Sequence, residues 1–134
     1  MKFEYSLAFP PGADGNYIRR PVVYVTLCKN ARKANGYALV DSGADMSLAH
    51  ISYARQLNLA SSRITTIRGI GAENVPCMIA EIVLSIDGIP GEIVVPFGFV
   101  DSASVEVVLG RGKFFDTHDV LFRVSKEFNG RSLK

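Results

Sequence analysis

The sequence contains few of the residues that hold metal ions or cross-link small domains. Of its 134 residues only two are cysteines, Cys28 and Cys77, and only two are histidines, His50 and His118. No CxxC or HExxH motif is present, and the two histidines lie far apart in the sequence. Zinc sites need clustered Cys and His ligands, and disulfide frameworks need more cysteines in a chain of this length. We therefore expect no metal site and two cysteines that pack as small apolar side chains.

The sequence also lacks a strong charge of either sign and a long hydrophobic run. It has 15 Lys and Arg residues against 13 Asp and Glu residues, a formal net charge of +2. Such a balance does not indicate a nucleic acid or a membrane surface as a partner. No apolar stretch approaches the length of a transmembrane helix, and the N-terminal residues lack the apolar core of a signal peptide. We expect a cytoplasmic location and neither nucleic acid nor membrane as a partner.

Apolar residues are abundant and occur in short runs. They make up 48% of the chain, enough to fill the core of a single domain spanning 1–134. Short strands separated by frequent turns are typical of a β-barrel or a β-sandwich. A polar connection is expected at 29–36, and Asp87-Gly88 is a strong hairpin signal. The expected strands are 2–9, 21–28, 37–40, 46–49, 64–70, 75–86, 93–95, 105–109 and 119–126.

Two segments interrupt this β pattern. The run 51–59 has apolar residues at helical spacing, with Ser52 as the expected N-cap and Asn58 as the expected stop. Residues 113–116 are expected to start a short helical turn. The sequence thus predicts an all-β domain with one or two short helices.

The most informative motif is the run 39–45, which reads LVDSGAD. Asp41 follows two apolar residues, so its carboxylate stands at the end of a buried strand, where desolvation is costly. Gly43 allows a sharp turn that brings peptide N–H groups close to this carboxylate, and Ser42 adds a hydroxyl. The motif predicts one reactive carboxyl group on a rigid loop. The alternative at this level is a hairpin turn that happens to contain Asp and Gly.

Three separated elements together resemble the retropepsin-like aspartic proteases, the single-domain relatives of pepsin found in retroviruses and as stand-alone bacterial domains. The run 39–45 looks like the catalytic loop of that family. The run 67–72 (IRGIGA) resembles the glycine-rich tip of its flap, and 107–111 (VVLGR) resembles the segment that passes behind its active site. The resemblance implies a closed, all-β acid-protease barrel with one or two short helices.

The resemblance also implies a role for each matching residue. Asp41 is the expected catalytic acid and base, within an active-site loop that includes Ser42, Gly43 and Ala44. Asp45 and Arg111 match positions that form a supporting ion pair. The implied flap and substrate-binding residues are Gly69, Ile70, Gly71 and Ala72, and the implied segment behind the site contains Leu109 and Gly110.

The chain carries half of the catalytic machinery that this family uses. Its proteases need two carboxyl groups and one water, and the two groups share one proton because they lie about 3 Å apart. Here only 41–43 has the Asp-Ser-Gly pattern, since 86–88 lacks the hydroxyl and 101–103 lacks the glycine. The resemblance therefore implies a homodimer with Asp41 of each copy at the two-fold axis, an endopeptidase acting on polypeptide without a cofactor. The alternative is a catalytically weak module of the same fold that binds peptides or assembles with partners.

Overall fold

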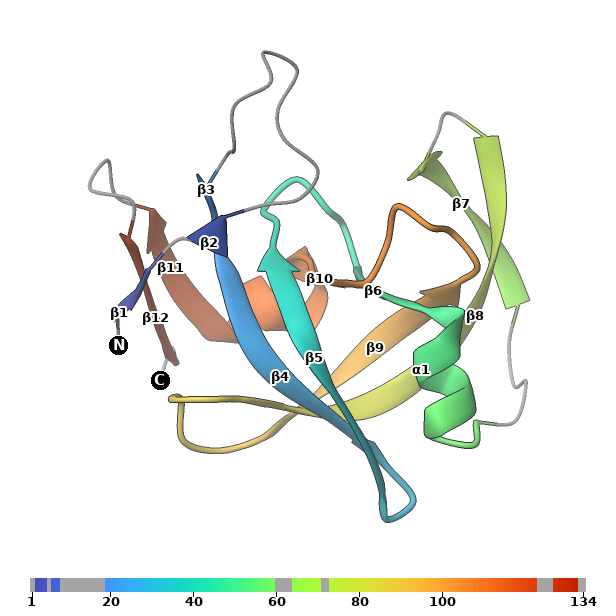
Figure 1. Ribbon diagram of the computed structural model, residues 1–134, viewed down its shortest axis with the longest axis horizontal. Helices are drawn as coiled ribbons and strands as arrows, with labels where there is room; N and C mark the ends of the chain where they lie inside the picture. The colour runs from blue at the N-terminus through green and yellow to red at the C-terminus, as the bar shows by residue number, and fades with distance from the viewer. Residues whose placement is uncertain are drawn as a thin grey trace.

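The computed structural model describes residues 2–4, 6–7, 19–59, 64–70, 73–122 and 127–132, and Figure 1 shows how their elements are arranged. Two short helical elements, α1 (Ile51–Gln56) and the irregular turn η1 (Arg111–Phe115), accompany a large set of strands. The strands are β1 (Lys2–Glu4), β2 (Ser6–Leu7), β3 (Arg19–Arg20), β4 (Val22–Lys29), β5 (Arg32–Val40), β6 (Ser47–His50), β7 (Ile64–Ile70), β8 (Glu73–Ile86), β9 (Ile93–Val100), β10 (Val107–Leu109), β11 (His118–Phe122) and β12 (Glu127–Ser132).

Six of these strands close into a barrel. Their order is β4-β5-β10-β6-β9-β8, and β8 pairs with β4 to complete the ring, while β7 extends the sheet beyond β8. The closing pairs are antiparallel and run from Val25↔Ile86 to Cys28↔Val83. Closure satisfies backbone groups that would otherwise form open sheet edges. The predicted closed all-β barrel with two short helical elements is confirmed.

The barrel interior is a continuous hydrophobic core. Along β4 the side chains alternate, so that Val23, Val25 and Leu27 are buried, as the two-residue period of a strand requires. Helix α1 packs outside the ring and buries Tyr53 and Ala54. Among the described residues no helix combines the length and hydropathy needed to cross a membrane. The largest fully buried side chains are Phe97, Phe99, Leu27, Leu57, Ile82, Leu84 and Leu109.

The first hairpin is longer than the sequence predicted. The expected polar connection at 29–36 is wrong, because β4 and β5 pair down to Lys29↔Arg32. The reversal takes only Asn30 and Ala31, both with positive φ (51° and 65°). Two-residue turns of this kind match the twist of the paired strands, and Arg32, Lys33 and Asn35 after the turn are exposed.

The C-terminal segment also differs from the prediction. In place of one strand over 119–126, β11 ends at Phe122 and β12 runs back antiparallel to it, with residues 123–126 outside the described part. The other edge of β12 pairs with β1 from the start of the chain. The resulting sheet, β1-β12-β11, lies on the side of the barrel opposite α1 (Figure 1). The prediction missed β12 because 127–132 (EFNGRS) contains no apolar run, and this strand is held by pairing with β11 and with the distant β1.

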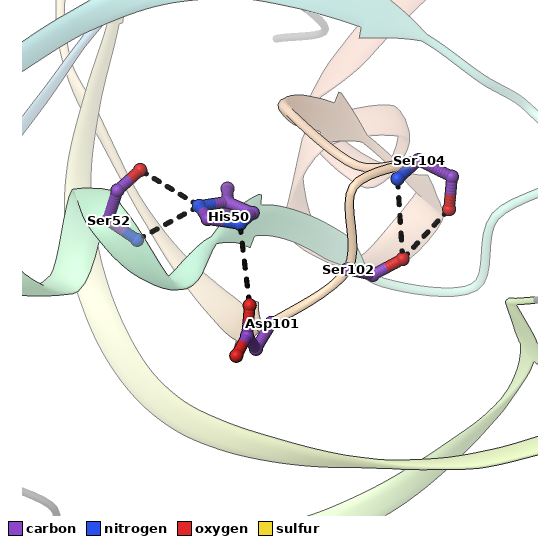
Figure 2. Close-up of polar contacts among 5 residues, drawn as sticks. All are labelled: His50, Ser52, Asp101, Ser102 and Ser104. Carbon is purple, nitrogen blue, oxygen red and sulfur yellow. Dashed lines mark hydrogen bonds and ion pairs between the residues drawn. The ribbon is translucent and has the colours of Figure 1, made fainter.

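Helix α1 is capped by His50 and not by Ser52 (Figure 2). The Nδ1 atom of His50 accepts a hydrogen bond from the Ser52 N–H at 3.2 Å and lies 2.9 Å from the Ser52 hydroxyl. The other ring nitrogen is 3.7 Å from Asp101 Oδ1, in the loop that follows β9. A histidine ring nitrogen can act as the capping acceptor in place of the usual oxygen. The predicted stop is confirmed, since Asn58 has a φ of 52° just after the helix.

Gly36 in β5 gives a first testable prediction. A Cβ at this position would meet the Tyr53 hydroxyl and would lie 3.0 Å from the ring carbon that carries it. We expect Gly36→Ala to lower the free energy of unfolding in urea by about 1–3 kcal/mol through overpacking. Adding Tyr53→Phe should recover part of this loss, because it removes the nearest atom.

The exposed neighbour Asn35 supplies the control for this experiment. Asn35→Ala should change the free energy of unfolding by less than about 0.5 kcal/mol. If Gly36→Ala is as mild as Asn35→Ala, the close approach of Tyr53 to β5 is wrong.

Candidate active site

The loop 41–46 joins β5 to β6 and carries Asp41 at its start. The Asp41 side chain is half-buried, and its Oδ1 accepts a hydrogen bond from the Gly43 N–H at 2.9 Å. The Ala44 N–H donates to the Asp41 carbonyl at 3.2 Å and closes the turn. Ser42 and Gly43 are exposed at its tip. The loop therefore holds one carboxylate at the surface with one oxygen oriented by main chain.

Strand β10 lies between the two strands that the loop connects. It pairs parallel with β5, with Leu109 opposite Val40, and antiparallel with β6, with Val107 opposite Ala49. The Asp41 N–H donates to the Leu109 carbonyl at 3.0 Å. The segment that contains Leu109 is therefore hydrogen-bonded directly to the start of the loop that carries Asp41.

Gly110 is the point of closest approach between this segment and the loop. A Cβ on Gly110 would meet the Met46 carbonyl group and would lie 2.8 Å from the Ala44 carbonyl oxygen. Main-chain atoms cannot move aside as a flexible side chain does, so only glycine fits. Beyond it, the Arg111 N–H donates to the Ala44 carbonyl at 2.8 Å and the Gly112 N–H donates to the Asp45 carbonyl at 3.0 Å.

The expected ion pair between Asp45 and Arg111 requires a correction. The two segments are in contact, but through the main-chain hydrogen bonds just described. In the described part of the chain these two side chains form no ion pair within 4.0 Å, and both residues are exposed. An exposed pair gains little over its hydration, whereas main-chain hydrogen bonds hold the segments together at no cost in side-chain entropy.

The implied flap corresponds to the hairpin of β7 and β8. Gly69 and Ile70 end β7, and Ile70 pairs with Glu73 at the start of β8. The register shifts between Ile67 and Ile70, so the hairpin contains an irregularity just before its tip. Gly71 and Ala72 lie outside the described residues. Strand β7 and the end of β8 that pairs with it extend outside the closed ring in Figure 1.

Two groups with perturbed pKa values belong to the core and not to this loop. Burial, together with the neighbouring Glu106, raises the pKa of the Tyr53 hydroxyl to about 12, and this hydroxyl lies 3.3 Å from Glu106 Oε1. Burial also raises the pKa of the Cys77 thiol. Both groups are therefore neutral at ordinary pH. Among the described residues no group of His, Cys, Asp and Glu side chains is arranged to hold a metal ion.

One polar residue at the site was not singled out from the sequence. Ser47 begins β6 and is 0% exposed. Its Oγ accepts a hydrogen bond from the Gly110 N–H at 3.1 Å. The only available signal was a serine between Met46 and Leu48 in an apolar strand, where a buried hydroxyl needs a partner.

Comparison with known proteins identifies the fold. No protein-family model and no curated protein matches the chain. The solved structure of EIAV protease complexed with the inhibitor HBY-793 is similar, with a TM-score of 0.53 and 26% sequence identity. The similarity covers 72% of this chain and 86% of that protease chain. The chain thus has a retropepsin-like fold, a closed barrel of the kind seen in a retroviral protease.

The absence of a side-chain ion pair between Asp45 and Arg111 is open to a direct test. A double-mutant cycle with Asp45→Ala and Arg111→Ala, followed by urea unfolding at low protein concentration, should give a coupling energy below about 0.5 kcal/mol. A coupling above about 1 kcal/mol at low concentration would contradict the exposed, unpaired arrangement. Coupling that arises only at high concentration would show that the pair forms on association.

Proposed function

We propose that this protein is an aspartic endopeptidase that works as a homodimer, with Asp41 of each copy forming the catalytic pair. The observation that carries the proposal is the loop itself. Asp41 leaves a buried strand, its Oδ1 is oriented by the Gly43 N–H at 2.9 Å, and β10 lies directly behind it. The similarity to a retroviral protease supports the same reading.

The proposed chemistry needs two carboxyl groups with different protonation states. One Asp41 carboxylate takes a proton from a water molecule, and the oxygen of that water attacks the scissile carbonyl carbon. The Asp41 carboxyl group of the other copy is protonated and donates a hydrogen bond to the carbonyl oxygen. Like charges about 3 Å apart cannot both form readily, so the pair holds one proton. The proton is then available for the leaving amine. No cofactor enters this scheme.

The remaining loop residues would shape the site around the pair. Ser42 and Gly43 are exposed at the tip of the loop, where a second copy would meet them at the two-fold axis. The polypeptide substrate would bind as an added strand, with main-chain hydrogen bonds giving affinity and side-chain pockets giving specificity. The hairpin that ends with Gly69 and Ile70, and continues through Gly71 and Ala72, is the proposed cover over that strand.

Asp41→Asn tests the catalytic assignment. Asn is nearly isosteric but cannot exchange the proton, so we expect cleavage of a peptide library to fall by about a thousandfold or more. The fold and the dimer should persist, as judged by circular dichroism and sedimentation. Asp87→Asn in the exposed turn after β8 is the matched control, because Asn-Gly also suits this turn, and it should cleave at the wild-type rate.

The same library distinguishes the proposal from a binding role. Wild-type cleavage that survives in Asp41→Asn would remove Asp41 from the mechanism. Peptide binding without cleavage by the wild type would instead favour a catalytically weak peptide-binding or assembly module.

Mixing experiments test whether the site is shared between copies. When equal amounts of wild type and Asp41→Asn exchange subunits, about one quarter of the dimers keep both Asp41 residues. Activity per total protein should therefore fall to about a quarter, whereas independent monomers would retain about half. Specific activity should also decline on dilution as the dimer dissociates. Activity that stays at half, and that does not change on dilution, would exclude a shared site.

A further inference from the structure

Among the described residues, Ser47 supplies the one side-chain hydrogen bond between the segment 41–47 and the segment 109–112. Four successive residues, Leu109 to Gly112, bond to the loop 41–46 or to the start of β6. Three of these bonds join main chain to main chain, so no substitution other than proline removes their donors or acceptors. The fourth runs from the Gly110 N–H to the Ser47 Oγ at 3.1 Å and depends on the serine hydroxyl.

A single peptide group links Ser47 to Asp41. The carbonyl of Leu109 accepts from the Asp41 N–H at 3.0 Å, and the N–H of Gly110, in the same planar peptide, donates to the Ser47 Oγ. Because the peptide unit is rigid, its two ends cannot tilt independently. Hydrogen bonds at its two ends also polarise one another. The two ends of the loop are therefore held by one rigid unit.

The hydrogen bond between Ser47 and Gly110 is buried, so its loss would be costly. Among the described side chains, Ser47 is the only serine, threonine, amide or charged residue that is buried. Gly110 is buried as well, and a Cβ there would meet the main chain of Met46 and Ala44. Without the hydroxyl, the Gly110 N–H would lose its acceptor where water does not readily replace it. The peptide could then satisfy its N–H only by moving, and Asp41 would move with it.

We propose that Ser47 is a positioning residue for Asp41, acting through the Leu109–Gly110 peptide group to set the separation of the two carboxyl groups. The inference rests on the proposed function, because it assigns Ser47 a part in the geometry of that same site. The splitting of the two apparent pKa values of a carboxyl pair depends on how close the groups lie. Loss of the Ser47 hydroxyl should therefore change the pH profile of activity as well as the rate.

The test compares Ser47→Thr with Ser47→Val. Threonine and valine have nearly the same shape: both add one methyl group to the serine side chain, and valine also replaces the hydroxyl with a second methyl, so steric effects are closely matched. We expect kcat of the valine variant to be about tenfold to a hundredfold below that of the threonine variant, the cost of a small misplacement of reacting groups. KM should differ little, and the pH profile of kcat/KM should be narrower for valine. Ser47→Ala, which is smaller than both, should follow valine if either larger side chain prevents folding.

Amide hydrogen exchange supplies a readout that needs no activity. The amides of Gly110 and Asp41 should exchange at least about tenfold faster in the valine variant than in the threonine variant. Ile82→Val is the control for loss of stability, because Ile82 is buried in β8 opposite Val95. It should lower the unfolding midpoint without changing kcat, the pH profile or the exchange of these two amides relative to their neighbours.

The possible outcomes distinguish a failure of the Ser47 proposal from a failure of the proposed peptidase function. Equal kcat, pH profile and exchange in the threonine and valine variants would overturn the role of Ser47. Faster exchange at Gly110 alone, with kcat and the pH profile unchanged, would also overturn it, because the hydrogen bond would then not act on Asp41. If the wild type has no peptidase activity but the exchange of both amides still differs, the proposed function fails and the positioning of Asp41 by Ser47 stands.

Discussion

The candidate site depends on the pairing of β10 with β5 on one edge and with β6 on the other. A strand that pairs on both edges can hydrogen-bond its peptide groups on both sides. On one of these edges, Leu109 of β10 pairs with Val40, the residue that precedes Asp41. Each main-chain hydrogen bond contributes only about 1 kcal/mol net, but leaving a buried one unmade costs more. The loop is therefore placed by several modest contacts whose loss would be costly.

Close approach at Gly110 is the steric counterpart of this bonding. The chain can cross the loop only where it has no side chain, because the carbonyl groups of Ala44 and Met46 occupy the space of a Cβ. The same approach brings the Arg111 and Gly112 amides within reach of the loop. The sequence motif around Gly110 thus reflects a packing requirement, and the exposed Arg111 side chain is not what joins the segments.

The terminal strands bear on how two copies would meet. Within one chain β12 already pairs with β1 on one edge and with β11 on the other. The free edges of this sheet are therefore those of β1 and β11 among the described strands. A dimer in which the terminal strands of two copies interleave would need β1 to leave β12, whereas contacts at the loop tip would need no such exchange. The proposed pairing of two Asp41 residues requires only the second kind of contact.

Local features of the sequence determined much of the fold. Short runs of strand-forming residues between turn signals predicted β4, β6, β7 and β8 close to their observed bounds, because such residues favour a half-buried sheet. The Asp41 loop, the Asp87-Gly88 turn and the Asn58 stop were also predictable, since each depends on the conformational preference of a few adjacent residues. The number and spacing of such strands indicated a β-barrel or a β-sandwich, and the family resemblance favoured the closed barrel.

Only the tertiary structure decided the contacts between distant segments. The place of β10 between β5 and β6 and the pairing of β12 with β1 depend on hydrogen bonds between residues far apart in sequence. The burial of Ser47 and the missing ion pair between Asp45 and Arg111 have the same origin. The type of a residue determines which kinds of partner its side chain can contact. Which partner it does contact depends on the strand that the closed barrel places beside it.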